Sequence, residues 1–146
     1  MGPTFKAVVV EQLFKATIDD VWKAITDINE MKLWYFNNIT DFEPQKGFKT
    51  KFTVKSDNRY FTHLWTITEV IPYKKISYTW QYEEYTGEST AYFELTSINN
   101  LTKLTVTCVG LETFQNDIPE FTHESCDAGW TYFIKNRLKE YLENKV

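Results

Sequence analysis

The side chains best suited to acid–base or nucleophilic chemistry at neutral pH are two histidines and two cysteines, namely His63, His123, Cys108 and Cys126. An unperturbed histidine titrates at about pH 6.5, so either histidine could serve as a general acid or base. His63 is in register with Phe61 and Trp65 in "RYFTHLWTI", which places it on the apolar side of a strand. We nevertheless favour the plainer interpretation of both histidines, as hydrogen-bonded or exposed polar residues.

The spacing of these residues argues against a metal centre. Only His123 and Cys126 are close in sequence, whereas structural zinc sites use paired short spacings. A second alternative is a catalytic nucleophile, Cys126, with His123 as its base. A nucleophile also needs an oriented oxyanion site, however, and the sequence cannot show one. Recognisable hydrolase, zinc-protease, phosphate-loop and haem motifs are lacking in the sequence. We expect no metal, no cofactor and no catalytic residue, and we expect the strand carboxylates Glu69 and Glu94 to be solvated.

Aromatic residues are unusually abundant and indicate either a ring-filled core or a ring-lined cavity. They make up 17% of the chain, with five Trp, nine Tyr and eleven Phe. Trp34, Tyr35 and Phe36 are consecutive, and three rings in a row cannot all point into one core. At least one of them is therefore expected at the mouth of a pocket.

The elements that must position these residues follow from the hydrophobic pattern. A strand is expected at residues 5–14, a helix at 16–27 capped by Thr17, and a short helix at 29–34. Five strands then follow, at 48–54, 59–70, 75–84, 89–98 and 101–110. Their short separators, "KSDN", "IPYK", "YTGE" and "NN", are rich in turn residues and predict an antiparallel meander. Threonines alternate with large apolar residues, so one face of the sheet is expected to be apolar.

A long helix over residues 124–144 is the element left to cover that apolar face. At 100° per residue its apolar stripe contains Trp130, Ile134, Leu138 and Tyr141. Continued toward the N-terminus, the same stripe is polar and contains His123, Cys126 and Asp127. Gly129 lies between the apolar and the polar half of the stripe. A glycine inside a helix indicates that the helix backbone passes close to another backbone segment or to the contents of a pocket. The predicted core residues are Trp22, Ile25, Trp80, Phe93, Val106, Ile134 and Leu138.

Composition excludes several classes of function. The net charge is −4 and the lysines are scattered, which argues against a nucleic-acid partner. The sequence has no apolar run of about 20 residues and no secretory signal pattern, so no membrane span is expected. Without such a signal, the two cysteines indicate reduced thiols and a cytoplasmic protein.

Several segments of the sequence, taken in order, resemble the START-like or Bet v 1-like (SRPBCC) helix-grip superfamily. Within it they resemble the group similar to the C-terminal domain of the activator of Hsp90 ATPase. The resembling segments are "ATIDDVWKAITDINEMKLW", "GFKTKF", "WTITEVIPYKKISYTW", "TKLTVTCVGLE" and "AGWTYFIKNRLKEYL". The resemblance covers residues 8–143. It implies an α+β fold in which a curved antiparallel sheet of about six strands wraps around a long C-terminal helix, with two short helices after the first strand.

The resemblance also implies a single domain over residues 1–146 with a cavity between sheet and helix. Members of the superfamily bind lipids, hormones, polyketides and other apolar molecules there, and a few are enzymes. The family often has a histidine where this chain has Cys108, so no role of that histidine is transferred.

The first function that we predict from the sequence is therefore non-catalytic binding of a small apolar or aromatic ligand in the cavity between sheet and helix. Two alternatives stay open: an Hsp90-activator-like interaction module, as a homodimer or with a chaperone partner, and a cyclase- or hydrolase-type enzyme that uses a cavity histidine. The predicted ligand-binding residues are Trp34, Tyr35, Phe36, His63, Trp65, Tyr78, Trp80, Cys108, His123, Cys126 and Trp130.

Overall fold

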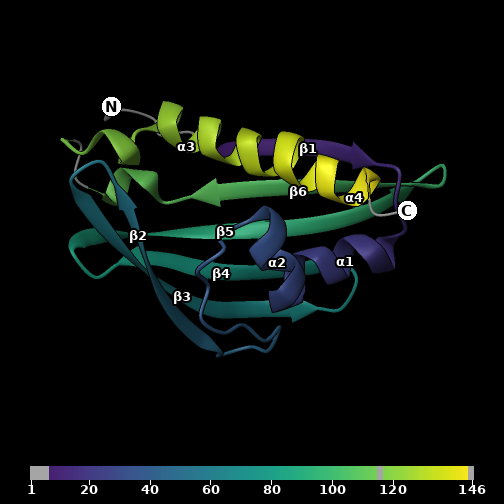
Figure 1. Ribbon diagram of the computed structural model, residues 1–146, viewed down its shortest axis with the longest axis horizontal. Coiled ribbons are helices and arrows are strands. Elements are labelled where there is room, and N and C mark those ends of the chain that lie inside the picture. Colours follow the sequence, from purple (N-terminus) through teal and green to yellow (C-terminus); the bar gives the residue numbers. More distant parts are fainter. Residues whose placement is uncertain (1–6, 115–116, 145–146) are drawn as a thin grey trace, which may run out of the picture.

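The computed structural model describes residues 7–114 and 117–144 and shows a curved antiparallel sheet with helices packed against one face (Figure 1). The strands are β1 (Val8–Phe14), β2 (Lys49–Ser56), β3 (Arg59–Ile71), β4 (Lys75–Tyr82), β5 (Tyr85–Ile98) and β6 (Leu101–Val109). Their order in the sheet is β1-β6-β5-β4-β3-β2, and every neighbouring pair is antiparallel. The predicted α+β helix-grip fold is confirmed. Phe5 and Lys6 of the predicted first strand lie outside the described residues.

Two short helices follow β1, as predicted: α1 (Ile18–Thr26) and α2 (Ile28–Trp34). The Thr17 hydroxyl accepts a hydrogen bond from the Asp20 N–H and begins α1. The Asp27 carboxylate accepts from the N–H groups of Asn29 and Glu30 and begins α2. Side-chain caps of this kind satisfy N–H groups that have no partner within the helix. The caps therefore place the boundary between α1 and α2 at Asp27.

The C-terminal helix is continuous but changes its pitch. It consists of α3 (His123–Trp130), a π-helical segment η3 (Thr131–Leu138) and α4 (Lys139–Glu143), and it runs along β1 (Figure 1). Its buried residues recur at every fourth position: Trp130, Ile134, Leu138 and Leu142. The 100° stripe predicted Tyr141 as the last of these contacts, but Tyr141 is only half-buried. A π-helix has more residues per turn, and so Leu142 takes the inward position.

One predicted turn is wrong by two residues. The separator "YTGE" at 85–88 belongs to β5, because Tyr82 pairs with Tyr85 and the turn consists of Glu83 and Glu84. The Glu84 carboxylate accepts hydrogen bonds from the Thr62 N–H, at 2.7 Å, and from the Thr62 hydroxyl, at 2.5 Å. This tertiary contact with β3 anchors the acidic turn, and turn propensity alone does not reveal it.

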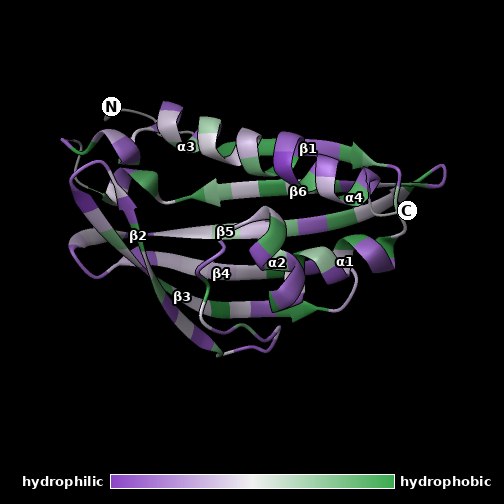
Figure 2. Cartoon of the chain, in the orientation of Figure 1, coloured by the Kyte–Doolittle hydropathy of each residue, from purple (hydrophilic) through white to green (hydrophobic). Residues whose placement is uncertain are grey.

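Hydrophobic and hydrophilic residues alternate along the strands, as Figure 2 shows. In β6 the side chains of Leu104, Val106 and Cys108 are buried, while Thr105 and Thr107 are half-buried on the opposite face. The alternation predicted from the sequence is confirmed, and it gives the helices one apolar surface to cover.

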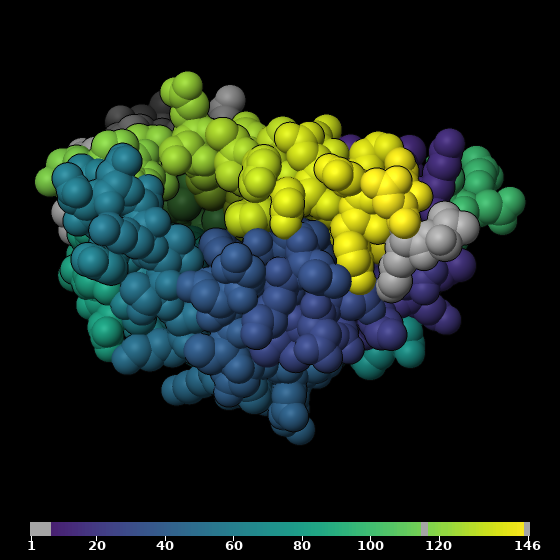
Figure 3. Space-filling model, in the orientation of Figure 1, coloured from purple at the N-terminus to yellow at the C-terminus, as the bar shows by residue number. Residues whose placement is uncertain are grey.

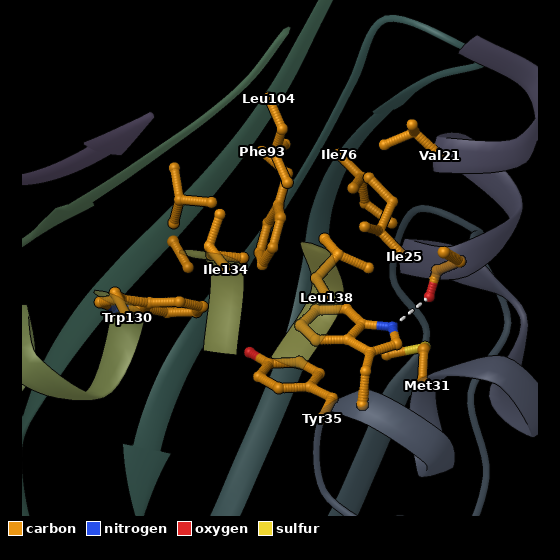
Figure 4. Packing of buried hydrophobic residues seen from close by; sticks show 14 of the residues in the cluster. Val21, Ile25, Met31, Tyr35, Ile76, Phe93, Leu104, Trp130, Ile134 and Leu138 are labelled. Carbon is orange, nitrogen blue, oxygen red and sulfur yellow. Dashed lines mark hydrogen bonds between the residues drawn. The ribbon is translucent and has the colours of Figure 1, made fainter. Parts of the chain in front are cut away.

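The core lies between that surface and the helices. Figure 4 shows Ile134 and Leu138 of the long helix beside Phe93, with Val21 and Ile25 entering from α1. Of the predicted core residues, Trp22, Ile25, Phe93, Val106, Ile134 and Leu138 are buried. Trp80 is half-buried, contrary to the prediction, because one side of its ring borders a pocket.

Candidate functional site

A pocket of about 120 Å³ lies between the sheet, the N-terminal half of the long helix and the segment that joins β6 to that helix. This connecting segment contains two short 3-10 helices, η1 (Leu111–Thr113) and η2 (Pro119–Phe121). Figure 3 shows the hollow on this face, between the β2–β3 hairpin, the α2 region and the long helix. The lining residues are Phe36, Trp80, Tyr82, Ser89, Cys108, Leu111, Phe114, Glu120, Phe121, Cys126, Gly129, Trp130 and Phe133.

Small side chains on the floor of the sheet make room for the pocket. Ser89 on β5 lies directly opposite Trp80 on β4, and Ala91 lies opposite Cys108 on β6. Ser89, Ala91 and Cys108 therefore share one face of the sheet, where residues two apart are neighbours. On the helix above, Gly129 adds no side chain. These small residues leave space among much larger rings.

The walls of the pocket are mostly aromatic. The rings of Trp80 and Trp130 meet edge to face at 5.6 Å, and those of Tyr82 and Phe121 stack at 5.1 Å. The Trp80 indole N–H donates to the Tyr82 hydroxyl at 2.8 Å. Burial raises the pKa of Tyr82 well above its usual value, so this phenol is neutral at physiological pH. This part of the wall is therefore uncharged.

Glu120 is the charged residue of the pocket lining. One of its oxygens accepts a hydrogen bond from the Ser56 hydroxyl at 3.0 Å. The other, Oε1, is buried without a hydrogen-bond partner among the described residues, and the Arg59 guanidinium lies 3.6 Å from it. Side chains of β2 and β3 thus hold the Glu120 carboxylate at one end of the pocket.

Two thiols also belong to the lining. Cys108 is only 3% exposed, and Cys126 is half-buried. A hydrogen bond from the Cys126 thiol lowers the pKa of Cys108, and the Ser89 hydroxyl and Trp130 indole N–H act in the same direction. The same hydrogen bond, together with burial, raises the pKa of Cys126. Donors gathered around one sulfur stabilise its thiolate form.

Five of the residues predicted to bind a ligand line this pocket: Phe36, Trp80, Cys108, Cys126 and Trp130. Four others are packed in the core behind it: Trp34, Tyr35, Trp65 and Tyr78. Tyr35 stacks on Trp34 at 4.6 Å, and its hydroxyl is 3.0 Å from the Tyr78 hydroxyl. The three consecutive rings thus divide, because Trp34 and Tyr35 enter the core and Phe36 reaches the pocket.

His63 lies one layer behind the pocket wall. Its side chain is 5% exposed, stacks on Phe52 at 4.7 Å, and contacts the ring of Trp80 at 5.3 Å. Its Nδ1 is 2.9 Å from the Phe61 carbonyl oxygen. Burial lowers the pKa of His63 to about 4, so the imidazole is neutral at physiological pH. His63 therefore acts as a packed ring of the core.

His123 and Asp127 do not belong to the pocket lining, in contrast to the polar stripe predicted for this helix. Both are exposed, whereas Cys126 is turned inward. The Thr122 hydroxyl caps α3 by accepting from the Ser125 N–H, and His123 is the first residue after this cap. His123, the first residue of α3, is therefore in solvent.

Gly129 makes no close approach to another backbone segment, and that part of the prediction is wrong. A Cβ atom at this position would meet no atom within 4 Å. The residue is half-buried and lines the pocket. Gly129 therefore leaves a gap in the helix surface that opens onto empty space.

The sequence did not single out a large part of the lining. The residues it missed are Tyr82, Ser89, Leu111, Phe114, Glu120, Phe121 and Phe133. Phe114 and Phe121 pack with Phe61 and Ile118 in a second apolar cluster beneath the connecting segment. The available signal was two phenylalanines and a proline within residues 111–121, a stretch that has neither a helical nor a strand period.

Other predicted features can be placed briefly. Glu94 is exposed, and Glu69 pairs with Lys75 at 3.0 Å, so both carboxylates face solvent as expected. Within residues 7–114 and 117–144, no three His, Cys, Asp or Glu side chains are grouped so that they could hold a metal ion. In the same part of the chain, no helix is both long and apolar enough to span a membrane.

Fold and pocket together define a START-like helix-grip protein. More narrowly, the chain belongs to the family described as activator of Hsp90 ATPase homolog 1-like protein, whose sequence profile matches residues 15–143. No curated protein sequence matches the chain.

Solved structures share the fold along nearly the whole chain. Protein MLL2253 from Mesorhizobium loti is 25% identical, with a TM-score of 0.77 and coverage of 97% of this chain and 99% of that one. The Aha1 dimer from Colwellia psychrerythraea is 19% identical, with a TM-score of 0.72 and coverage of 95% and 97%. CalU16 from Micromonospora echinospora is 18% identical, with a TM-score of 0.70 and coverage of 95% and 77%.

Proposed function

We propose that this protein binds a small aromatic ligand, without catalysis, in the pocket between the sheet and the long helix. The observation that carries the proposal is the lining itself: seven of the thirteen lining residues bear aromatic rings. Ligand sites in proteins are mostly apolar, with a few polar groups that orient the ligand. Here Glu120 and the thiol pair are those polar groups.

The volume and the charge narrow the class of ligand. An engineered cavity of roughly 150 Å³ lined by Leu, Ile and Phe binds benzene. A pocket of about 120 Å³ is therefore matched to about one ring. Because the carboxylate-bearing residue Glu120 belongs to the lining, the preferred ligand is a ring that carries an O–H or N–H donor.

A binding experiment with matched probes tests this proposal. Phenol and indole, titrated by calorimetry, are expected to bind more tightly than toluene, which has no donor. Replacing Glu120 with Gln should reduce this preference, because a carboxylate is a stronger acceptor than an amide. If none of the three probes binds, or if toluene binds as tightly as phenol, the proposed ligand class is wrong.

A pair of variants at Gly129 tests the location of the site. Gly129→Leu places a large side chain in the open space beside the pocket, and we expect it to weaken phenol binding at least about tenfold, the equivalent of ~1.4 kcal/mol. Gly129→Ala is the control and should bind phenol as the unmodified protein does. Equal affinity in all three proteins would place the bound probe elsewhere.

A chaperone-interaction module is a second candidate, favoured by the family to which the chain belongs. Binding to purified Hsp90, with the rate of ATP hydrolysis as readout, separates it from the ligand-binding proposal. A homodimer also stays a prediction, and light scattering of the purified protein tests it. The enzyme alternative required a cavity histidine, and neither His63 nor His123 lines the pocket.

A further inference from the structure

The ring of Phe36 borders both the pocket and a group of rings packed behind it. Phe36 is half-buried and belongs to the pocket lining. Three buried rings that are not part of the lining form what we call the rear cluster: Phe52, His63 and Trp65. The centroid of the Phe36 ring is 5.2 Å from that of Phe52 and 5.1 Å from that of His63. It is 6.0 Å from that of Trp65. Phe36 therefore stands where the pocket meets the rear cluster.

The rear cluster itself is closely packed. Phe52 stacks on His63 at 4.7 Å and meets Trp65 edge to face at 4.8 Å. Each of the three side chains is at most 5% exposed. Protein interiors of this density have few voids larger than a water molecule, so a ligand cannot enter the cluster while all its rings are in place. Room for a longer ligand in this direction must come from the position of Phe36.

Phe36 also differs from other lining rings in its place in the chain. Trp80 and Tyr82 are on β4, and Trp130 is the last residue of α3. Phe36 follows α2 in a segment, residues 35–48, that forms neither helix nor strand. A side chain in such a segment can change without loss of the hydrogen bonds that hold a sheet or a helix together. The size of residue 36 can therefore set the size of the pocket while the surrounding elements stay the same.

We propose that Phe36 is the specificity-determining residue of the pocket and limits its ligands to a single ring, an inference that rests on the ligand-binding function proposed above. The pocket of about 120 Å³ has room for about one ring. Truncation of Phe36 to alanine removes a ring at the boundary with the rear cluster and leaves a second ring-sized space. Apolar cavities of that kind stay dry and bind aromatic molecules. The truncated pocket is therefore expected to accept two linked rings.

The test compares phenol with 4-phenylphenol, which carries a second ring opposite the hydroxyl group. Calorimetry with the unmodified protein and with Phe36→Ala gives the affinity of each protein for both probes. We expect the ratio of 4-phenylphenol affinity to phenol affinity to rise at least about tenfold in Phe36→Ala, because only the longer probe fills the new space. An unchanged ratio would overturn the proposal.

The imidazole of His63 reports where the second ring lies. His63 borders the new space, whereas His123, the other histidine of the sequence, is exposed. In Phe36→Ala, 4-phenylphenol should shift the imidazole NMR signals of His63 and leave those of His123 unchanged. A gain in affinity without a shift at His63 would place the second ring elsewhere and would contradict the proposal.

Phe52→Ala is the matched control. It removes the same side chain from the rear cluster but keeps Phe36 in the lining. The ratio of the two affinities should therefore equal that of the unmodified protein. An equal rise in Phe36→Ala and Phe52→Ala would show that the packing of the whole cluster, and not Phe36, limits the ligand.

Phe36→Leu keeps the test decisive if Phe36→Ala does not fold, because truncation of a packed ring lowers stability. Leucine leaves part of the space open and should give a smaller rise in the same ratio. If neither variant folds, Phe36 is a structural residue and the proposal is wrong. Phenol binding to the unmodified protein separates the two proposals. If phenol binds and the ratio stays unchanged, only the role of Phe36 fails, whereas both proposals fail if phenol does not bind.

Discussion

At the scale of single residues, Gly129 combines a helical backbone with open space where a side chain would lie. Alanine has the better helix propensity, and its methyl group would meet no atom within 4 Å. We expect Gly129→Ala to raise the free energy of unfolding by about 1 kcal/mol, measured by urea unfolding.

Gly87→Ala is the matched control for this prediction. Gly87 has φ +124°, and a Cβ there would lie 2.4 Å from a ring atom of Phe114. This substitution should therefore destabilise the protein, because an L-residue is strained at that backbone angle and the ring must move. A loss of stability in Gly129→Ala would show that the helix needs glycine at 129 for a reason other than space.

At the scale of elements, Leu138 links the long helix to the core. Its side chain is fully buried among the side chains of the main hydrophobic cluster. Leu138→Ala should lower the free energy of unfolding by roughly 2–5 kcal/mol, as other large-to-small core substitutions do. Asn136→Ala, at an exposed position in the same π-helical segment, should change it by less than about 0.5 kcal/mol. A loss below about 0.5 kcal/mol in Leu138→Ala would mean that this helical face is not buried.

Arg137 joins the long helix to α2. Its Nη2 donates to the Leu33 carbonyl at 2.7 Å, and its Nε donates to the Trp34 carbonyl at 3.5 Å. These carbonyls belong to the last turn of α2 and have no acceptor role within the helix. We expect Arg137→Met to lower the free energy of unfolding by about 1 kcal/mol.

The same variant should also weaken phenol binding, because Phe36 lies two residues beyond the anchored end of α2. Lys135→Met removes a positive charge from an exposed position of the same segment and is the control. If both variants lose the same stability, the loss reflects charge on the helix and not the link to α2.

At the scale of the whole molecule, burial of His63 makes stability depend on pH. The folded-state pKa is about 4, whereas an unfolded histidine has a pKa of about 6.5. Between these pH values the unfolded chain binds a proton at His63 that the folded chain does not bind. The contribution of His63 to stability is therefore complete above pH 6.5 and is lost as the pH falls toward 4. At pH 5 the loss from this one group is about 2 kcal/mol.

His63→Phe keeps a ring against Phe52 and removes the titration. Urea unfolding at pH 8 and pH 5 should therefore show a drop in stability that is about 2 kcal/mol smaller in the variant than in the unmodified protein. The comparison cancels the carboxylates, which titrate in both proteins. An identical drop in the two proteins would show that His63 is protonated in the folded state.

What the sequence by itself determined is the set of elements and the face that each one buries. Thr17 caps α1, threonines alternate with large residues along β6, and Ile134 and Leu138 follow a helical stripe. These signals are local, because a cap acts within one turn and an alternation reflects the strand's own geometry. They predicted an antiparallel sheet covered by a long helix and part of its core, whereas the helix-grip fold followed from the resemblance to a known family.

The tertiary structure alone decided which residues meet at the pocket. Cys108 and Cys126 line one pocket because strand register and helix position bring them there, and neither is encoded in the spacing between the two residues. Leu142 replaces Tyr141 because the helix widens where it packs on the sheet. His123 is in solvent although the next turn of its helix brings Cys126 into the pocket lining. Each outcome depends on packing between distant segments, which a periodic pattern within one segment does not contain.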